Sequence, residues 1–366
     1  MKKALALLLG VIMLLTMAAC GNAPAETKAE EPTPAAEENA PADETTETAF
    51  DPYYFSQLKE GASNESPAAN PAKERYTIGV LLPMLSNAHF TAEAYGFQSE
   101  AEALGVDVII WDCGGYSYFD KQVTQMEDLI SMGVDAIVLV AADADACVPT
   151  IDAAFEAGIP VIIYDGYWTD GEEKAVTTVT WDQKATGTLV GEYFVNYVKE
   201  NNGGKCRVVE LTNAVSTHCQ ERFVGLHEVI DAANADGCEI EILNKYDSRG
   251  NRETAYNAIS AIVEPYDYII SDVDNGAMGA VAALQAVGNT DVKVFSMGAY
   301  GAEPFGKLHD NDVNYQACLN VDAWVLAQFI YEGAISYFEG KDVPTKTNID
   351  LFVVDSTNVE NFWSFD

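Results

Sequence analysis

Short apolar runs alternate with amphipathic stretches from residue 76 onward. Four of these runs have the length and composition of strands that are buried on both faces of a parallel sheet. They cover residues 77–83, 106–112, 134–140 and 159–164. Between these runs, apolar residues recur at the spacing of an amphipathic helix, and a glycine suited to ending a helix follows such stretches. The first predicted helix covers 90–104 and ends at Gly105. The second places Val123, Met126, Leu129 and Ile130 on one face and ends at Gly133. The third covers 148–157.

The same alternation restarts after residue 205. Strands are predicted at 206–211, 239–243, 266–271 and 292–296, and helices at 220–232, 252–263 and 277–287. Residues 121–140 and 252–271 align as a faint internal repeat of helix, break and strand. Strands that alternate with helices indicate parallel sheets covered on both faces. The sequence therefore predicts an α/β protein with two similar lobes.

The lobe boundaries follow from where the pattern is interrupted. We expect the chain to cross between lobes near 180–182 and near 297–299. The N-terminal lobe would hold 76–180 and 299–340, the C-terminal lobe would hold 181–298, and 341–366 would pack on the lobes. Ligands of open parallel sheets bind outside the carboxyl ends of the strands. Residues at those ends are therefore the candidates for a site in a cleft between the lobes.

The first 19 residues have the pattern of an export signal. Lys2 and Lys3 precede an apolar run at 4–17 that is short for a membrane-spanning helix. The stretch LTMAACG (15–21) resembles a bacterial lipobox, which implies that Cys20 is lipidated and becomes the first residue. Acyl chains on Cys20 would anchor the protein to the outer face of the cell membrane, outside the cytoplasm. A plain signal peptide with a chance cysteine is the alternative.

Residues 20–75 are predicted to be a disordered acidic tether. Residues 23–49 are built mainly from Ala, Pro, Glu and Thr, without an aromatic residue, and cannot bury enough apolar surface to fold. The aromatic segment 50–55 either docks back on the body or contacts a partner. The full chain carries 57 acidic and 20 basic residues, a formal charge of −37. This charge argues against binding to nucleic acid, which needs clustered Lys and Arg.

Several stretches, taken in order, resemble the type I periplasmic (solute-)binding protein family of the ribose/galactose kind. They are IGVLLPMLSNAHF (78–90), KQVTQMEDLISMGVDAIVLVAADADA (121–146), AGIPVIIYDG (157–166), GAMGAVAALQA (276–286) and VKVFSMG (292–298). The resemblance implies two Rossmann-like lobes with parallel sheets, joined by a three-segment hinge that closes on a small solute. It also implies a partner in the membrane, either the permease of an ABC importer or a sensor kinase.

Only some of the family's ligand-binding residues have a counterpart in this sequence. Asn87, His89 and Phe90 stand where sugar receptors carry a polar residue and aromatics, and Asp165 matches their acidic residue. Gly166 replaces the arginine that follows it, and the arginine of the first C-lobe helix falls near Gln220, close to Arg222. Val273 replaces an asparagine beside the retained Asp274, and Gly298 replaces an aspartate. The predicted ligand-binding residues are Asn87, His89, Phe90, Tyr116, Asp165, Trp181, Gln220, Asn251, Asp274 and Tyr300.

Three further stretches resemble the periplasmic trimethylamine N-oxide sensor protein. They are Gly114-Gly115-Tyr116, Val179-Thr180-Trp181 and FVVDSTNVENF (352–362). The resemblance implies an aromatic site at Phe90, Tyr116, Trp181 and Tyr300. The alternative to an importer component is therefore a sensor that signals to a membrane histidine kinase.

The candidate residues favour a neutral or cationic polar solute. Carboxylates accept hydrogen bonds from hydroxyls or pair with cations, and aromatic faces stack on sugars or hold ammonium groups. Apart from Arg249 and Arg252, arginine is scarce at the strand ends, which disfavours anions. Each candidate also has a structural interpretation: a loop cap for Asp165, hinge packing for Trp181, a surface turn for Tyr116 and a helix cap for Asn87.

No catalytic or metal-binding motif is present. The four histidines lack paired spacing, so we expect no metal and no cofactor, and His89 is interpreted as a polar lining residue. The chain lacks the nucleophile elbow, the Walker loop and the dinucleotide-binding turn, so we expect a monomeric binding protein without enzyme activity. Cys206 and Cys238 open strands that should be neighbours, and either form a disulfide or stay free thiols.

Overall fold

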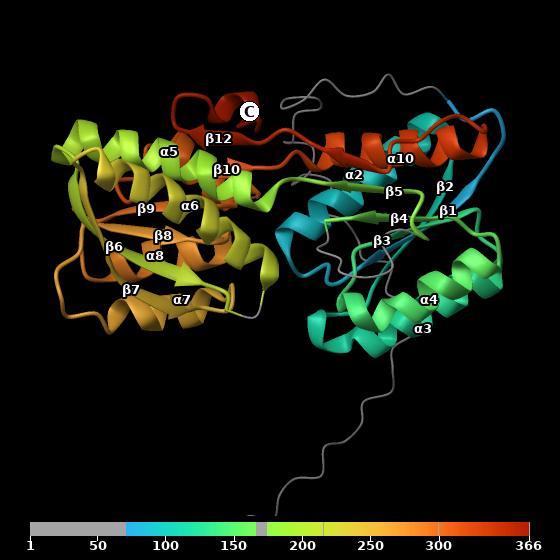
Figure 1. Ribbon diagram of the computed structural model, residues 1–366, viewed down its shortest axis with the longest axis horizontal. Coiled ribbons are helices and arrows are strands. Elements are labelled where there is room, and N and C mark those ends of the chain that lie inside the picture. Colours follow the sequence, from blue (N-terminus) through green and yellow to red (C-terminus); the bar gives the residue numbers. More distant parts are fainter. Residues whose placement is uncertain (1–70, 166–173, 215, 299, 366) are drawn as a thin grey trace, which may run out of the picture. The chain divides into compact units, whose positions relative to one another are not determined.

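The computed structural model describes residues 71–165, 174–214, 216–298 and 300–365. These residues belong to one unit, Thr48–Asp366, which contains two α/β lobes (Figure 1). The predicted signal peptide, Cys20, nearly all of the tether and the aromatic segment 50–55 lie outside the described residues. In the described part of the chain, no helix is both long enough and apolar enough to cross a membrane.

The N-terminal lobe is a six-stranded sheet in the order β11-β5-β4-β3-β1-β2, with every neighbouring pair parallel. Its strands are β1 (Thr77–Leu82), β2 (Asp107–Asp112), β3 (Ala136–Leu139), β4 (Val161–Tyr164), β5 (Thr177–Thr180) and β11 (Lys346–Asn348). Helices α2 (Ala88–Leu104) and α10 (Ala323–Phe338) pack together on one face. Helices α3 (Phe119–Met132) and α4 (Ala144–Glu156) cover the other face, and the short helix η1 (Tyr116–Tyr118) precedes α3.

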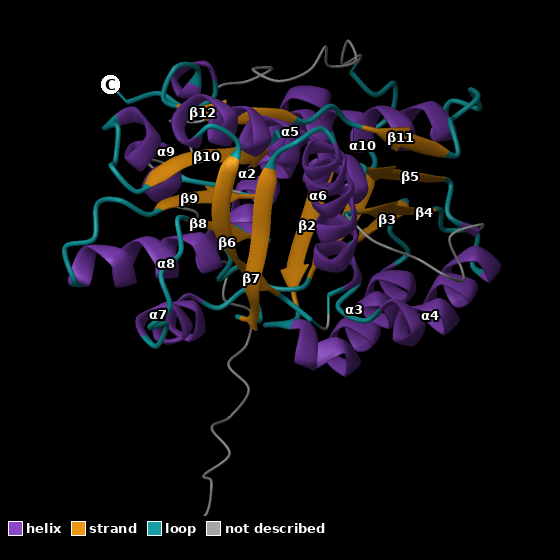
Figure 2. Ribbon diagram, turned by 60° about the vertical axis from the view of Figure 1, so that its left-hand side comes forward, coloured by secondary structure: helices purple, strands orange, loops and turns teal. Residues whose placement is uncertain are grey.

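The C-terminal lobe repeats this plan with the order β12-β10-β9-β8-β6-β7 (Figure 2). Its strands are β6 (Lys205–Thr212), β7 (Glu239–Asp247), β8 (Tyr268–Ser271), β9 (Lys293–Ser296), β10 (Tyr315–Asn320) and β12 (Phe352–Asp355). Only β12 runs antiparallel to its neighbour among these strands. The helices are α5 (Gln183–Asn202) and α6 (Thr217–Ala235) on one face, α7 (Arg252–Ser260), α8 (Asp274–Ala286) and α9 (Ala302–His309) on the other, and the short η3 (Val359–Asn361).

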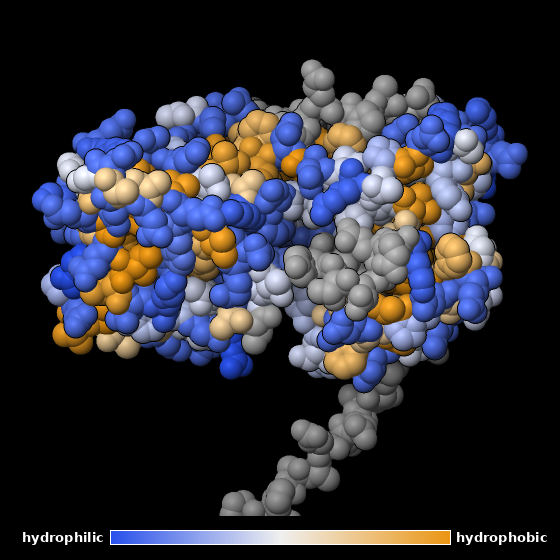
Figure 3. Space-filling view, viewed as in Figure 1, coloured by the Kyte–Doolittle hydropathy of each residue, from blue (hydrophilic) through white to orange (hydrophobic). Residues whose placement is uncertain are grey.

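The predicted two-lobed α/β architecture with largely parallel sheets is confirmed. All four residues of β4 and all four of β8 are buried, which explains why these strands have continuous rather than alternating apolar sequences. Gly105 and Gly133 end α2 and α3 with φ angles of 72° and 70°, in the left-handed region that glycine adopts without strain. The face seen in Figure 3 is mainly hydrophilic, as expected for such a charged chain.

The second crossing between the lobes lies elsewhere than predicted. After β9 the chain continues through α9 and β10 in the C-terminal lobe, and it returns to the N-terminal lobe at residues 321–322, not at 297–299. Residues 302–320 therefore belong to the C-terminal lobe, where the prediction placed 299–340 in the other. The physical reason is burial, because Phe305 and Leu308 of α9 pack in the C-lobe core with Trp363.

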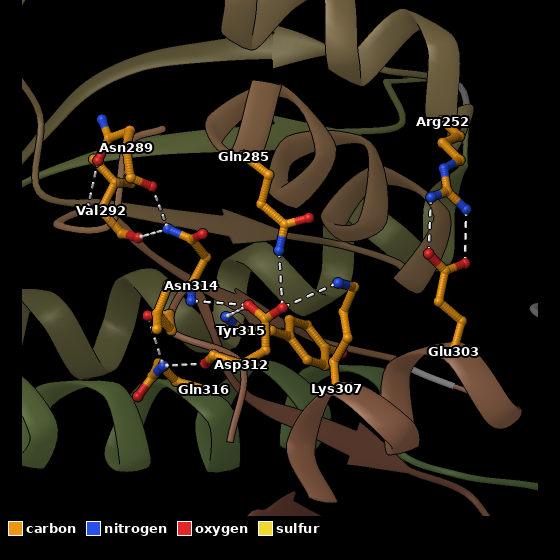
Figure 4. A network of polar contacts seen from close by, with 11 residues as sticks. Arg252, Gln285, Asn289, Val292, Glu303, Lys307, Asp312, Asn314, Tyr315 and Gln316 are labelled. Atoms are coloured by element: carbon orange, nitrogen blue, oxygen red, sulfur yellow. Dashed lines mark hydrogen bonds and ion pairs between the residues drawn. The ribbon is translucent and has the colours of Figure 1, made fainter. Parts of the chain in front are cut away.

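Polar contacts also tie this segment to the C-terminal lobe (Figure 4). Arg252 of α7 donates two hydrogen bonds to Glu303 of α9, at 2.7 and 2.8 Å. The carboxylate of Asp312 accepts from Gln285 at 2.9 Å, from Lys307 at 3.0 Å and from two backbone N–H groups. These bonds hold α7, α8 and α9 around the turn that leads into β10.

The two crossings that lead into α5 and α10 have the same local structure. Asp182 and Asp322 are the N-caps of α5 and α10, and both have φ −77° and ψ 109°. The side chain of Asp182 accepts from the N–H of Ala185, and that of Asp322 accepts from Trp324 and Val325. Each crossing therefore turns directly from a strand of one lobe into a capped helix of the other lobe.

The C-terminal segment contributes a third crossing at residues 349–351. It adds β11 to the edge of the N-lobe sheet and β12 to the edge of the C-lobe sheet, so it extends both sheets.

Cys206 and Cys238 are free thiols in the structure, so this pair adopts the unlinked alternative rather than the disulfide. Burial raises the pKa of Cys206 to about 12, which keeps this thiol protonated and unreactive.

We predict that Asp312→Ala lowers the free energy of unfolding at neutral pH by about 1–3 kcal/mol, because four donors lose their acceptor. Chemical denaturation measures the change. Asp310→Ala is the matched control, since that side chain is 80% exposed two residues away. Equal effects of the two substitutions would contradict the anchoring role of Asp312.

Candidate functional site

Polar side chains of both lobes gather at the carboxyl ends of the strands. Asp165 follows β4 and Trp181 follows β5 in the N-terminal lobe. Asn213 follows β6 and Asp272 follows β8 in the C-terminal lobe. Parallel pairing places these ends at one edge of each sheet, the position at which open α/β sheets bind ligands.

The N-lobe part of the site is built around His89 at the start of α2. Its Nε2 lies 2.9 Å from an oxygen of Glu93, one helical turn later, and 3.5 Å from an oxygen of Asp165. The hydroxyl of Tyr164 donates to the other oxygen of Glu93 at 2.9 Å. Glu93 is fully buried, and the φ angle of Asp165 is 41°, which is unusual for a residue with a side chain.

The two carboxylates keep His89 charged. Burial by itself would lower the pKa of His89, but Glu93 and Asp165 outweigh it and raise the pKa to about 10. The imidazole is therefore a cation at neutral pH. Burial raises the pKa of Glu93, and the charge of Asp165 adds to this while His89 opposes it. The three side chains form one ion network.

The same three residues could in principle ligate a metal, since their ligand atoms lie within 4.8 Å of one another. His89, however, already lies between the carboxylates as a cation. A metal ion would have to displace its proton and occupy the same space. The interpretation of His89 as a polar lining residue, made without any metal, fits this arrangement.

Aromatic rings surround His89. Phe90, Trp181 and Tyr300 are buried, and their ring centroids lie 5.3, 5.8 and 5.6 Å from that of His89. Tyr116 packs edge-on against Phe90 at 6.5 Å and is 51% exposed. The structure thus brings together the four aromatic positions that the sequence singled out.

The C-lobe part of the site is built around Arg222 of α6. Its Nε donates to Gln183 at 2.8 Å, and its Nη1 donates to the backbone carbonyls of Asp272 at 2.8 Å and Met297 at 3.2 Å. Arg222 therefore joins the first crossing to the ends of β8 and β9. The Asp272 side chain is fully buried, and neither of its carboxylate oxygens has a hydrogen bond of good geometry within the described residues.

Burial raises the pKa of Asp272 to about 6, against the opposing influence of Cys219, Arg222 and nearby backbone N–H groups. Burial also raises the pKa of Asp274, although the charges of Arg222 and His89 act against the rise. Both carboxylates are thus held in surroundings that disfavour their ionised forms.

The two halves of the site are close enough to interact. The charge of His89 in the N-terminal lobe acts on the carboxylate of Asp274 in the C-terminal lobe. The charge of Asp165 likewise acts across the cleft on His218, whose pKa is lowered by burial. The described residues therefore form one bipartite site rather than two separate patches.

Some predicted ligand residues make local bonds instead of pointing free groups into the cleft. The Asn87 side chain caps α2 by accepting from the N–H of His89 at 2.8 Å, and the Asn251 side chain caps α7. Exposed Gln220 donates to the carbonyl of Asn213 at 2.8 Å. The hydroxyl of Tyr300 accepts from the N–H of Ala323 at 2.7 Å.

Three charged residues of the site are not among the predicted ligand-binding residues. Glu93 lies four positions after His89, so helical spacing would have placed both on one face. Asp272 directly follows a predicted strand, which was a usable signal. Arg222 was noted only as a neighbour of Gln220, because the helix face it occupies was unknown.

We predict that His89 stabilises the fold in a pH-dependent way. Its pKa is about 10 in the folded chain and 6.5 ordinarily, so its contribution is complete below about pH 6.5 and is lost as the pH rises towards 10. The difference in unfolding free energy between the wild type and His89→Gln should shrink across that window, by at most about 1.4 kcal/mol per pH unit.

Chemical denaturation from pH 6.5 to 10 measures this difference. His309→Gln controls for the loss of a histidine elsewhere, on a side chain that is 37% exposed. A difference that stays constant over the window would show that His89 is neutral in the folded protein.

Three comparisons place the chain among known proteins. The family model described as periplasmic binding protein domain matches residues 78–355. The D-apiose import binding protein of Actinobacillus succinogenes is 28% identical over 79% of this chain and 91% of its own length. The ribose import binding protein of Escherichia coli (strain K12) is 25% identical over 77% of this chain and 92% of its own length.

Solved structures share the fold. An ABC transporter solute binding protein from Bradyrhizobium sp. BTAi1, with bound Bis-Tris, has a TM-score of 0.70 at 20% identity and covers 83% of this chain and 90% of its own. A periplasmic solute binding protein from Actinobacillus succinogenes, with bound D-allose, has a TM-score of 0.68 at 22% identity over 78% of this chain and 100% of its own.

These matches extend over both lobes, and they confirm the expectation of a binding protein rather than an enzyme. The chain belongs to the periplasmic binding protein domain family.

Proposed function

We propose that the chain is the lipid-anchored, extracytoplasmic solute-binding component of an ABC importer. Its ligand is a small neutral or cationic polar solute, sugar-like in its hydroxyl groups, bound between the two lobes. Relatives named for the import of ribose and D-apiose, aligned over most of both chains, support this assignment.

One observation carries the proposal. Buried polar atoms at the strand ends and the first crossing have no hydrogen bond of good geometry among the described residues. They include donors, Nε1 of Trp181 and Nε2 of Gln183, and acceptors, Oδ1 of Asn213 and the carboxylate of Asp272. Leaving such a group unpaired costs about 1–3 kcal/mol. A solute whose hydroxyls both donate and accept hydrogen bonds would satisfy both kinds of atom.

The mechanism is closure of the lobes around the solute. Asp165 and Trp181 belong to one lobe, and Asn213 and Asp272 belong to the other, so a solute that contacts all four favours the closed form over the open form. The permease would then distinguish the loaded protein by the relative position of its lobes.

Sensing is the second candidate role. The gathering of Phe90, Trp181 and Tyr300 around His89 also suits a small N-oxide or amine, as the resemblance to the trimethylamine N-oxide sensor implied. A membrane histidine kinase would replace the permease as partner. The ligand screen described below therefore includes sugars, amines and N-oxides.

We predict that Trp181→Phe weakens binding of the solute found in that screen by about tenfold to a hundredfold, because the unpaired indole N–H would become its hydrogen-bond donor. Calorimetric titration measures the affinity. Trp324→Phe is the matched control, since that indole already donates to Glu100 between α2 and α10. Unchanged affinity in Trp181→Phe would contradict the proposed site.

A thermal-shift screen of the full chain tests the function itself. A solute present at a hundredfold excess over its Kd stabilises by about 2.7 kcal/mol and raises the melting temperature. Asp165→Ala should abolish that shift. The absence of any hit among sugars, amines and N-oxides would count against solute binding.

The anchor has a separate test. Cys20→Ser should move the protein from the membrane fraction to the soluble extracytoplasmic fraction, because the thiol that accepts the lipid is lost. Immunoblotting of the fractions measures the distribution. Continued membrane association of the variant would contradict lipidation at Cys20.

A further inference from the structure

The charges of the site do not balance. Four carboxylates lie in it, those of Glu93, Asp165, Asp272 and Asp274, and two cations, His89 and Arg222. Counted as ionised, the carboxylates exceed the cations by two charges, although burial raises the pKa of Glu93, of Asp272 and of Asp274. His218 does not change this balance, because burial lowers its pKa and leaves the imidazole neutral at pH 7.

Among the residues that the structure describes, two further arginines near these strand ends are already paired with carboxylates. Arg249 and Arg252 lie at the C-lobe strand ends, but they pair with Asp247 at 3.7 Å and Glu303 at 2.7 Å. The segment 166–173 follows Asp165 and reads GYWTDGEE, without Lys, Arg or His. Its own charged residues are acidic, so it cannot supply the missing positive charge.

By count each lobe holds one of the two excess negative charges, but among the described residues only the C-lobe carboxylates lack a direct ion pair. In the N-terminal lobe, Glu93 and Asp165 share the charge of His89 at 2.9 and 3.5 Å. Asp272 and Asp274 have no ion pair among the described residues, and Arg222 reaches the former only through its backbone carbonyl. Burying a charge is costly unless it is paired, so on closure around an uncharged solute these two carboxylates would stay unpaired or take up protons, whereas a cation would pair with their ionised forms.

We propose that the solute carries a positive charge, as an organic amine or ammonium group that pairs with Asp272 and Asp274 in the closed site. This inference rests on the proposed function and narrows its ligand class. The half-exposed ring of Tyr116 beside Phe90 offers an aromatic face that suits an ammonium group better than a bare metal ion. A metal ion held by His89, Glu93 and Asp165 would first have to displace the proton on the His89 nitrogen that faces both carboxylates.

Matched probes test the charge separately from shape. The full chain is titrated calorimetrically with D-glucosamine and D-glucose, and with choline and its uncharged isostere 3,3-dimethylbutan-1-ol, after a thermal-shift survey of the wider panel. Within the pair that binds, we expect the charged member to bind at least about tenfold more tightly, or about 1.4 kcal/mol. That preference should fall with added salt.

Variants of the two carboxylates test whether they pair with the charged probe. Asp274→Asn and Asp272→Asn keep the side-chain shape, and each should reduce the preference for the charged probe severalfold. Asp310→Asn, on an exposed side chain of the C-terminal lobe, should keep it. Two site variants are used so that poor folding of one does not remove the test.

The outcomes separate this inference from the function on which it rests. Tighter binding of the neutral members would overturn the positive charge and leave solute binding intact. Stabilisation by Zn²⁺ alone, with no amine binding, would overturn the organic cation in favour of a metal. No shift with any sugar, amine, N-oxide or metal would contradict solute binding itself, and the inference with it.

Discussion

Parallel strand pairing is the constraint on which this protein depends. A parallel strand can follow another only after a crossover, so each helix returns the chain to the same starting edge of the sheet. All carboxyl ends of the parallel strands then lie at the opposite edge. Residues as distant in sequence as His89, Asp165 and Trp181 are neighbours for this reason.

The same edge concentrates charge. His89, Glu93 and Asp165 form an ion network that is closed within one lobe, whereas Asp272 and Asp274 have no counterpart of that kind. The carboxylates in one half of the site thus contact a cation directly before a solute arrives, and those in the other half do not. Under the proposed function, such an asymmetry would favour one orientation of the solute over the reverse.

Local patterns allowed much of the fold to be predicted. Strands such as β4 and β8 are continuous apolar runs, and Gly105 and Gly133 ended helices where expected. The position of the second crossing was not predictable in this way. Strand β10 has the sequence YQACLN, which mixes polar and apolar residues. Tertiary contacts of Phe305, Leu308 and Asp312 place the segment that leads into it in the C-terminal lobe.

The site was predictable to a similar degree. Topology selected Asp165 and Trp181 correctly as strand-end residues, and spacing could have added Glu93. A helix cap was one of the two interpretations of Asn87, and the structure contains it, but sequence alone could not choose between them. Nor could it show that Asn251 caps α7 or that Asp272 is buried without a good hydrogen-bond partner. Those facts depend on which donors the fold brings within reach, and the chain pattern does not contain that information.

Asp182 and Asp322 give the two crossings an identical turn, and that identity limits how the lobes can move. Together with the third crossing at 349–351, these two turns tie the lobes at three places. We expect links of this kind to favour a hinge rotation over sliding, because a rotation can leave both caps intact. A partner that reads the state of the protein would then have one angle to measure.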